Sequence, residues 1–248
     1  MNKKLRVGID INEVLRAKWL QFDRYYVEEF GEEGVPTEQL YVYDFVNSYK
    51  WKDTIEISKD LKEPEDMPEN INPIDYQHNE KLGEAPADAF LFKAPEKIKL
   101  TAKEVYNRFM YQDFVYEIHG SAPIMYKNMD LHVKNFYEKY KDTVDFTLYS
   151  RENIFSIPST LFFLSKITSR FSKYHFFEKN DEVWDNVDIF ITTDPEFIIS
   201  IPKNKKIIKL LRPYNEKFNI SCISPVLQLN DLNGNEEFEK LIKYNKTN

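Results

Sequence analysis

The chain has 248 residues and a formal net charge of -7, with 41 acidic and 34 basic residues. This acidic balance argues against a general nucleic-acid binder, because neutralising phosphates requires a net basic face. Hydrophobic residues make up 42% and aromatic residues 15%, which predicts a folded protein with a buried core. No stretch approaches the ~20 apolar residues of a membrane span, and the single cysteine, Cys222, excludes an intramolecular disulfide. We therefore expect a cytoplasmic protein without membrane segments.

The first elements expected along the chain are a buried strand and an amphipathic helix. Residues 5–10 form a short apolar run after a charged tail, which is typical of a buried strand. Residues 13–30 carry apolar side chains at spacings that fall on one helical face. Gly31 and Gly34 follow, and glycine commonly ends a helix.

The middle of the chain differs in composition from both ends. Residues 53–95 are rich in Pro, Glu, Asp and Asn without a sustained period, which predicts an irregular insertion. Thr101 and Glu104 have the spacing of a capping box and open a helix predicted to extend to residue 118. Another helix is expected at 130–140. The predicted organisation is a core domain of residues 1–39 and 129–248, with residues 40–128 as an inserted cap-like region.

Strands and helices alternate beyond residue 142. The predicted strands are residues 144–149, 174–177, 187–191, 206–211 and 226–229. The predicted helices are residues 157–171, 195–201 and 236–244. This alternation indicates βαβ crossovers, so we expect a three-layer α/β/α fold with a mostly parallel sheet.

Polar residues follow three of the predicted strands. They are Asp10, Ser150 and the run Thr-Thr-Asp at 192–194. In an open parallel sheet, chemistry collects at the carboxyl ends of the strands. Each residue has a simpler interpretation: Asp10 and Ser150 as caps, and an Asp before Pro as an ordinary helix start. Their occurrence together and in this order favours a functional site.

Four segments resemble three motifs of the haloacid-dehalogenase (HAD) family, in its nucleotidase-like branch, and the strand that follows the last motif. The first motif, an apolar strand ending in Asp-x-Asp, resembles VGIDINEVLR. The second, an apolar strand ending in Ser or Thr, is similar to FTLYS. The fourth motif and the strand after it resemble DIFITTDPEFI and KKIIKLLRPYN. The resemblance covers residues 4–30 and 143–245, and the segment between them corresponds to a cap insertion.

The resemblance implies roles for individual residues. In the family the first Asp attacks phosphorus, the second acts as general acid and base, and Mg²⁺ bridges the nucleophile and acidic residues of the fourth motif. Asp10 then takes the nucleophile position and Ser150 the phosphate-binding hydroxyl. Lys179 is the phosphate-binding lysine, with Lys173 as the alternative. Mg²⁺, if bound, would be held by Asp10 and Asp194.

The chain departs from the family pattern at the catalytic positions. Asn12 stands at the acid/base position, and an amide cannot donate a proton as a carboxylic acid does. Thr192 and Thr193 align with the acidic pair, which leaves Asp194 one position late. Losing acid/base help alone costs ~10²–10⁴-fold in rate, and magnesium requires hard anionic oxygen ligands.

Two functions remain open. The favoured one is a non-catalytic binding or assembly module without a cofactor, located in the cytoplasm or, for a viral source, in the virion. The alternative is a divergent Mg²⁺-dependent phosphohydrolase of the 5'-nucleotidase-like type, in which Glu13, Glu152 or Asp194 stands in by a shifted register.

The inserted region is predicted to contact a protein partner or a second copy. Its Pro- and acid-rich stretch, residues 63–95, lies between aromatic-rich segments at 41–51 and 109–116, and aromatics are enriched at interface cores. The alternative is that the aromatics pack inside the chain, with these side chains buried: Tyr41, Tyr43, Phe45 and Trp51.

The remaining candidates for chemistry carry weaker signals. The histidines show no ligand spacing, which predicts core or surface roles for His78, His119, His132 and His175. Cys222 has no basic neighbour in sequence and is expected to be structural.

Overall fold

The computed structural model describes residues 4–35, 45–51, 100–167, 170–223 and 226–244. The predicted irregular stretch at 53–95 lies outside them. The chain divides into two compact units, residues 52–105 and the remainder. In the smaller unit, the predicted capping box forms at the start of helix α3 (Ala102–Arg108): the Thr101 N–H donates to Glu104 Oε2 at 2.8 Å, and the Glu104 N–H donates back to Thr101 Oγ1 at 3.3 Å. The predicted domain boundaries at 39 and 128 stay a prediction.

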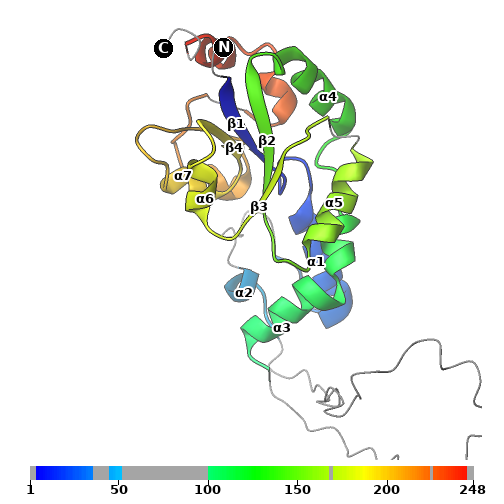
Figure 1. The fold of residues 1–248 in the computed structure, drawn as a ribbon. Coiled ribbons are helices and arrows are strands. Elements are labelled where there is room, and N and C mark those ends of the chain that lie inside the picture. The colour runs from blue at the N-terminus through cyan, green and yellow to red at the C-terminus, as the bar shows by residue number, and fades with distance from the viewer. Residues whose placement is uncertain (1–3, 36–44, 52–99, 168–169, 224–225, 245–248) are drawn as a thin grey trace, which may run out of the picture. The chain divides into compact units, whose positions relative to one another are not determined.

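A five-stranded parallel sheet forms the centre of the larger unit (Figure 1). Its strands are β1 (Leu5–Asp10), β2 (Val144–Arg151), β3 (Tyr174–Phe177), β4 (Ile189–Thr192) and β5 (Lys206–Lys209), in the order β3-β2-β1-β4-β5. The central strand is therefore β1. In its register Ile9 lies opposite Leu148 of β2 and Ile191 of β4. The predicted three-layer fold with a parallel sheet is confirmed.

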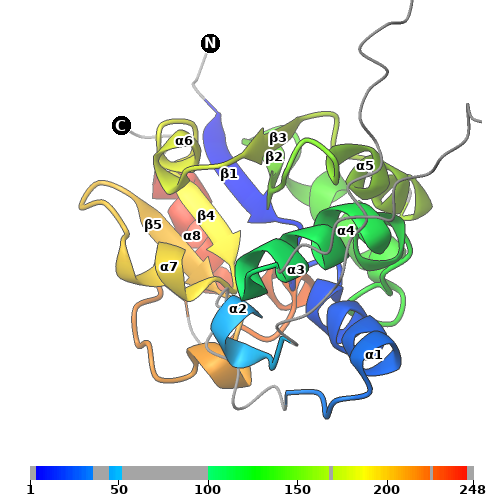
Figure 2. The same cartoon turned by 90° about the horizontal axis from the view of Figure 1, so that it is seen from below.

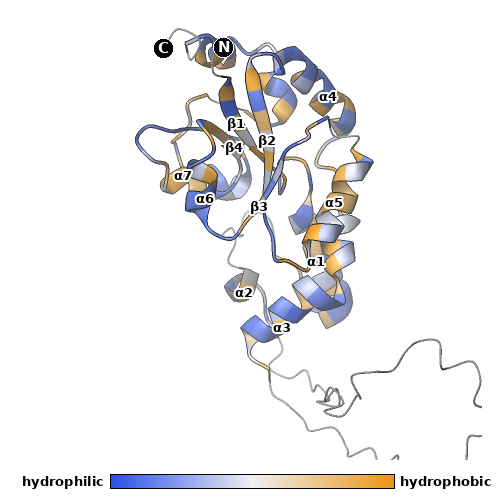
Figure 3. Ribbon diagram, viewed as in Figure 1, coloured by the Kyte–Doolittle hydropathy of each residue, from blue (hydrophilic) through white to orange (hydrophobic). Residues whose placement is uncertain are grey.

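Helices cover both faces of the sheet. One face packs against α4 (Met129–Tyr140), α5 (Ile157–Lys166) and α8 (Glu236–Tyr244) in a large apolar core. The other face packs against α6 (Asn180–Trp184) and α7 (Pro195–Ile199) in a smaller core. Figure 2 shows α4 and α5 on one side of β1 and α6 and α7 on the other. Helices α4 and α5 carry both polar and apolar residues, as expected when a helix buries one face (Figure 3).

The sequence of β1 fits this two-sided burial. Leu5, Val7 and Ile9 alternate onto the face of the larger core. Gly8 lies between them, and a Cβ atom there would be only 2.8 Å from side-chain atoms of Phe190 and Val187. A glycine at this position therefore lets the smaller core approach the central strand.

The predicted helix at residues 13–30 begins later than expected. The observed α1 is Lys18–Phe30, and the preceding residues form a turn in which Glu13 has φ of 57°. The Glu13 carboxylate accepts a hydrogen bond from the Trp19 N–H at 2.7 Å, and so satisfies a donor of the first helical turn. The residues after Asp10 therefore make a tight loop.

Two other predicted elements also differ. A single helix was predicted at 101–118. The structure instead has α3, which ends at Arg108, followed by two π-helical turns, η4 (Phe109–Asp113) and η5 (Tyr116–Gly120). The predicted strand at 226–229 is not a strand. Asp231 Oδ2 accepts from the backbone N–H groups of residues 227 and 228, which directs this backbone into the 3-10 helix η7 (Leu229–Leu232).

Aromatic side chains after α2 (Phe45–Ser48) pack against α1. Trp51 is 9% exposed, and its ring centroid lies 5.4 Å from that of Tyr26 and 5.9 Å from that of Phe109. Trp51 and Phe109 thus pack inside the chain. This agrees with the alternative in which the aromatic residues are buried within the chain and do not form an interface. Tyr41, Tyr43 and the side chain of Phe45 lie outside the described residues. None of the helices that the structure describes is long and apolar enough to cross a membrane.

Candidate functional site

The carboxylate of Asp10 lies buried at the end of the central strand. Its Oδ1 accepts from the backbone N–H of Asn12 at 3.1 Å, and its Oδ2 accepts from the Thr192 hydroxyl at 2.7 Å. Burial raises the pKa of Asp10 to about 6, although both hydrogen bonds oppose the rise. The side chain is 3% exposed, so its oxygens are occupied by the protein and shielded from water.

Asp194 lies near Asp10, at the end of β4. Its Oδ1 accepts from the backbone N–H of Glu196 at 2.8 Å and caps α7. Its Oδ2 is 3.7 Å from the Arg151 guanidinium. Burial raises the pKa of Asp194 to about 8, the charge of Asp10 adds to this rise, and Arg151 opposes it. Asp194 therefore carries a proton at pH 7.

Asn12 points into a buried polar network. Its Nδ2 donates to Ser150 Oγ at 3.0 Å, and its Oδ1 accepts from Nε of Arg16 at 3.1 Å. Asn12 is 2% exposed, and Ser150 and Arg16 are fully buried. The amide at the predicted acid/base position therefore serves to orient its neighbours.

The network centres on an ion pair between Arg16 and Glu152. Nη2 of Arg16 lies 2.6 Å from Oε1 of Glu152, and neither side chain is exposed. Nη1 of Arg16 donates to the His119 carbonyl and to the Thr160 hydroxyl. Three hydroxyls donate to the Glu152 carboxylate, those of Ser150, Ser156 and Thr160. The single proton of the Ser150 hydroxyl is thus committed to Glu152.

Burial and the Arg16 guanidinium determine which side chains of this network are charged. Burial lowers the pKa of His119 to about 4, so this histidine is neutral at pH 7. Burial alone would raise the pKa of Glu152, but the Arg16 guanidinium at 2.6 Å holds that pKa well below the ordinary value. Glu152 is therefore ionised and matched by the guanidinium.

The two candidate lysines lie outside this network. Lys173 is on the surface before β3, where its Nζ lies 2.6 Å from Asp145 Oδ2, near the amino end of β2. Lys179 follows β3 at the correct edge of the sheet, is exposed and caps α6. In the described part of the chain, neither donates to Asp10 or Ser150.

The residues present do not fit Mg²⁺. No group of three or more His, Cys, Asp or Glu side chains within the described ranges is arranged to hold a metal. Asp10 Oδ2, which would have to bind the metal, accepts a hydrogen bond from Thr192, and Mg²⁺ demands a near-octahedral set of oxygen ligands.

The other candidate residues have structural surroundings. His119 stacks on Tyr111 with ring centroids 5.7 Å apart. His78 lies outside the described residues, and burial raises the pKa of Cys222 to about 11.

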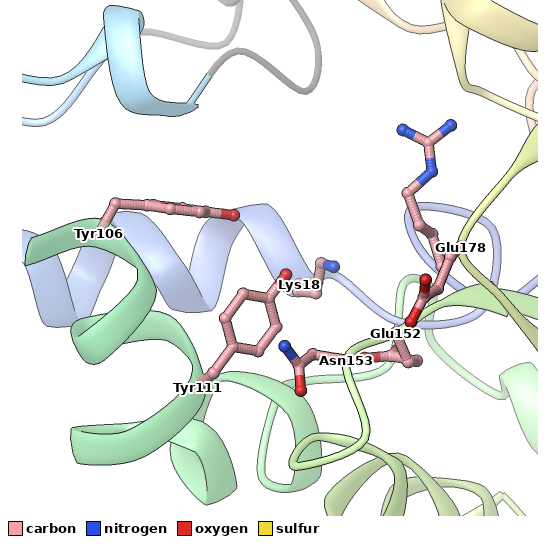
Figure 4. A pocket seen from close by; sticks show the side chains of 7 residues that line it. Lys18, Tyr106, Tyr111, Glu152, Asn153 and Glu178 are labelled. Atoms are coloured by element: carbon pink, nitrogen blue, oxygen red, sulfur yellow. The ribbon is translucent and has the colours of Figure 1, made fainter. Parts of the chain in front are cut away.

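A cavity that sequence reasoning missed opens at the carboxyl end of β2 (Figure 4). Its volume is ≈ 280 Å³, and its walls come from α1, α3, η4, the end of β2 and the loops after β2 and β3. The lining residues are Lys18, Tyr106, Tyr111, Arg151, Glu152, Asn153 and Glu178. The one available signal was Lys18, a charged residue on the apolar face of the helix predicted at 13–30.

The sheet and its buried polar edge define a parallel, Rossmann-like α/β protein. No protein-family model and no curated protein matches the chain. Its class therefore rests on the fold described above.

Proposed function

We propose that this chain is a non-catalytic protein with a HAD-like fold, retained as a binding or structural module. Two features support the HAD-like resemblance: Asp10 ends the central strand, and the strands ending near Ser150 and Thr192 are its two neighbours. The observation that carries the non-catalytic assignment is the Arg16–Glu152 ion pair. Arg16 donates a hydrogen bond to Asn12, and Glu152 accepts one from Ser150, so both side chains are engaged by the pair.

Each part of a phosphoryl-transfer centre is engaged elsewhere. The amide of Asn12 has no acidic proton, and the Ser150 hydroxyl donates to Glu152. Asp10 is buried and accepts from Thr192 in place of a metal. Catalysis of phosphoryl transfer depends on positioned charge around the moving group, and the described residues provide no such arrangement.

The module is further proposed to bind a protein partner or a second copy through residues 40–128. It would act in the cytoplasm, or in a virion if its source is viral. Composition supports this proposal: the stretch at 63–95 is rich in Pro and acidic residues and has few apolar residues to bury.

One observation favours the alternative, a divergent Mg²⁺-dependent 5'-nucleotidase-like phosphohydrolase. The pKa of Asp10 is raised to about 6 and that of Asp194 to about 8. Carboxyl groups whose pKa values differ at neighbouring positions are a common acid and base pair in enzymes. In this alternative Asp194 donates the proton that Asn12 cannot.

Turnover of phosphate esters tests the proposal. Purified full-length protein with 4-nitrophenyl phosphate or AMP and Mg²⁺ is expected to release phosphate at the background rate. Asp10→Asn should leave that rate unchanged. Clear turnover in the wild type that disappears in Asp10→Asn would establish the enzyme instead, and its loss in Asp194→Asn would identify the acid.

A further inference from the structure

Lys18 is a buried cation whose amine has no hydrogen-bond or ion-pair partner among the residues that the structure describes. The side chain is 6% exposed and lines the ≈ 280 Å³ cavity beside β2. Within the parts of the chain that the structure describes, it makes no hydrogen bond and no ion pair. Figure 4 shows its amine directed into the cavity. A buried charge without a partner is costly, so the amine is a site to which an anion can bind with a gain in stability.

The buried acidic groups whose charges favour the charged form of Lys18 are Glu152, Glu13 and Asp10, and each accepts hydrogen bonds from other groups. Glu152 is committed to Arg16 at 2.6 Å. Glu178 is exposed to solvent at the mouth of the cavity, where water screens its charge. The charge of Arg16 adds to the effect of burial, and both lower the pKa of Lys18, whereas the charge of Glu152 opposes them. An anion in the cavity would supply the partner that the protein does not.

Two tyrosines complete the lining opposite Lys18. Tyr106 and Tyr111 have ring centroids 6.3 Å apart at 87°, which presents an aromatic wall. The Tyr106 hydroxyl is hydrogen-bonded to the hydroxyl of Tyr111. In Figure 4 the Tyr111 hydroxyl points toward the amine of Lys18. A cation, a hydroxyl donor and an aromatic surface thus meet in one cavity.

We propose that this cavity binds a small organic anion, a phosphate monoester or a carboxylate, whose charged group pairs with Lys18 and accepts from Tyr111. The volume suits a compact ligand, because sites for drug-sized molecules are ~300–1,000 Å³. The organic part of the ligand packs on the two tyrosine rings. The inference does not depend on the absence of turnover, because it concerns binding alone.

Calorimetric titration of the full-length protein tests this site with three probes of similar size. Phenyl phosphate and benzoate carry the anionic groups in question, and benzyl alcohol is neutral. We expect saturable binding of at least one anion and none of the alcohol, and the stronger anion identifies the ligand class. Phosphate release is assayed in the same samples, so that binding and turnover are scored separately.

Variants assign the binding to the cavity. Lys18→Met, which keeps the length of the side chain and removes the charge, should weaken anion binding at least tenfold. Tyr111→Phe should weaken it severalfold. Lys173→Met removes an exposed lysine paired with Asp145 and serves as the matched control, with unchanged affinity. Equal binding by Lys18→Met, or equal binding of benzyl alcohol, would refute the proposal.

A measurement on the wild type guards against a misfolded variant. Acetylation of lysines by an N-hydroxysuccinimide ester is followed residue by residue with mass spectrometry. The bound anion should slow modification of Lys18 severalfold and leave Lys173 unaffected. An unchanged rate at Lys18 under saturating phenyl phosphate and benzoate would contradict the assignment.

Discussion

Arg16 lies four residues after Asn12 and is fully buried. Its donors bind Asn12, His119, Thr160 and Glu152, so the guanidinium is satisfied by the protein itself. Arginine suits this role because it stays charged and presents a rigid fork of N–H groups. Buried ion pairs contribute little net stability, yet breaking one is costly, since the remaining charge stays buried.

Glu152→Gln is expected to lower the free energy of unfolding by ~3–5 kcal/mol, because Arg16 would remain buried without its counter-charge. Urea denaturation followed by tryptophan fluorescence measures the change. The double variant Arg16→Met with Glu152→Leu should lose less stability than the summed losses of Arg16→Met and Glu152→Leu made singly. Arg24→Ala, which breaks the exposed pair with Glu28, is the control and should produce no measurable change. A Glu152→Gln protein as stable as the wild type would show that the pair is not formed.

At the scale of elements, the loop after β4 shows how a single side chain serves a helix and the site together. Asp194 caps α7 through Glu196, and its N–H donates to the Thr192 hydroxyl, which in turn donates to Asp10. Asp at an N-cap is ordinary. What is unusual is that this cap is 2% exposed, so its charged form is disfavoured.

Asp194→Asn is expected to flatten the dependence of stability on pH. The folded pKa of about 8 exceeds the unfolded value of 3.8, so the folded state binds a proton that the unfolded state has released between these values. The contribution of Asp194 to stability therefore falls as pH rises from 4 to 8, by up to about 1.4 kcal/mol per pH unit. The variant keeps the cap and lacks this contribution. Urea midpoints at several pH values measure the difference.

Asp188→Asn is the matched control for this experiment. Burial raises the pKa of Asp188, but hydrogen bonds from Arg6 bring it below the ordinary value. Its contribution to stability is therefore lost only as pH falls below about 4. The difference between this variant and the wild type should be constant from pH 5 to pH 8. The same constancy for Asp194→Asn would disprove the raised pKa of Asp194.

At the scale of the whole molecule, aromatic residues before the stretch at 63–95 belong to the packed unit. Trp51 and Tyr49 are buried against Phe22 and Tyr26 of α1. These two side chains, which precede the segment at 63–95 in the sequence, are therefore part of the core. Any contact with a partner through the inserted region therefore depends on that segment more than on these aromatics.

Deleting residues 63–95 is expected to abolish association and spare the fold, because no described core residue is removed. Sedimentation velocity reports association, and circular dichroism with urea unfolding reports the fold. Replacing the segment by an equally long Gly-Ser linker controls for chain length. A wild-type protein that is monomeric and recovers no partner from its native context, or a deletion variant that still associates, would contradict the proposed role of residues 40–128.

Local patterns in the sequence were sufficient to predict the parallel sheet. The largely apolar segments at 5–10 and 144–149 and the helices between strands predicted a parallel α/β fold, because strands that alternate with helices form βαβ units. They also placed Asp10 at the end of the first strand, as found. The central position of that strand, between β2 and β4, is a property of the tertiary structure. Local chemistry likewise predicted the capping box at Thr101 and the helix start at Asp194. Such features depend on neighbours within a few residues.

The state of the site was decided by tertiary contacts alone. Glu152 lies 136 residues after Arg16, and Ser150 lies 138 residues after Asn12. Only the pairing of β1 with β2 brings them together, and only burial makes their charges matter. The same holds for Lys18, whose sequence position shows a break in an apolar face but neither a cavity nor a missing partner. Sequence periodicity reports which side of an element faces the core, whereas hydrogen bonding and charge in a buried site depend on residues that folding alone brings into contact.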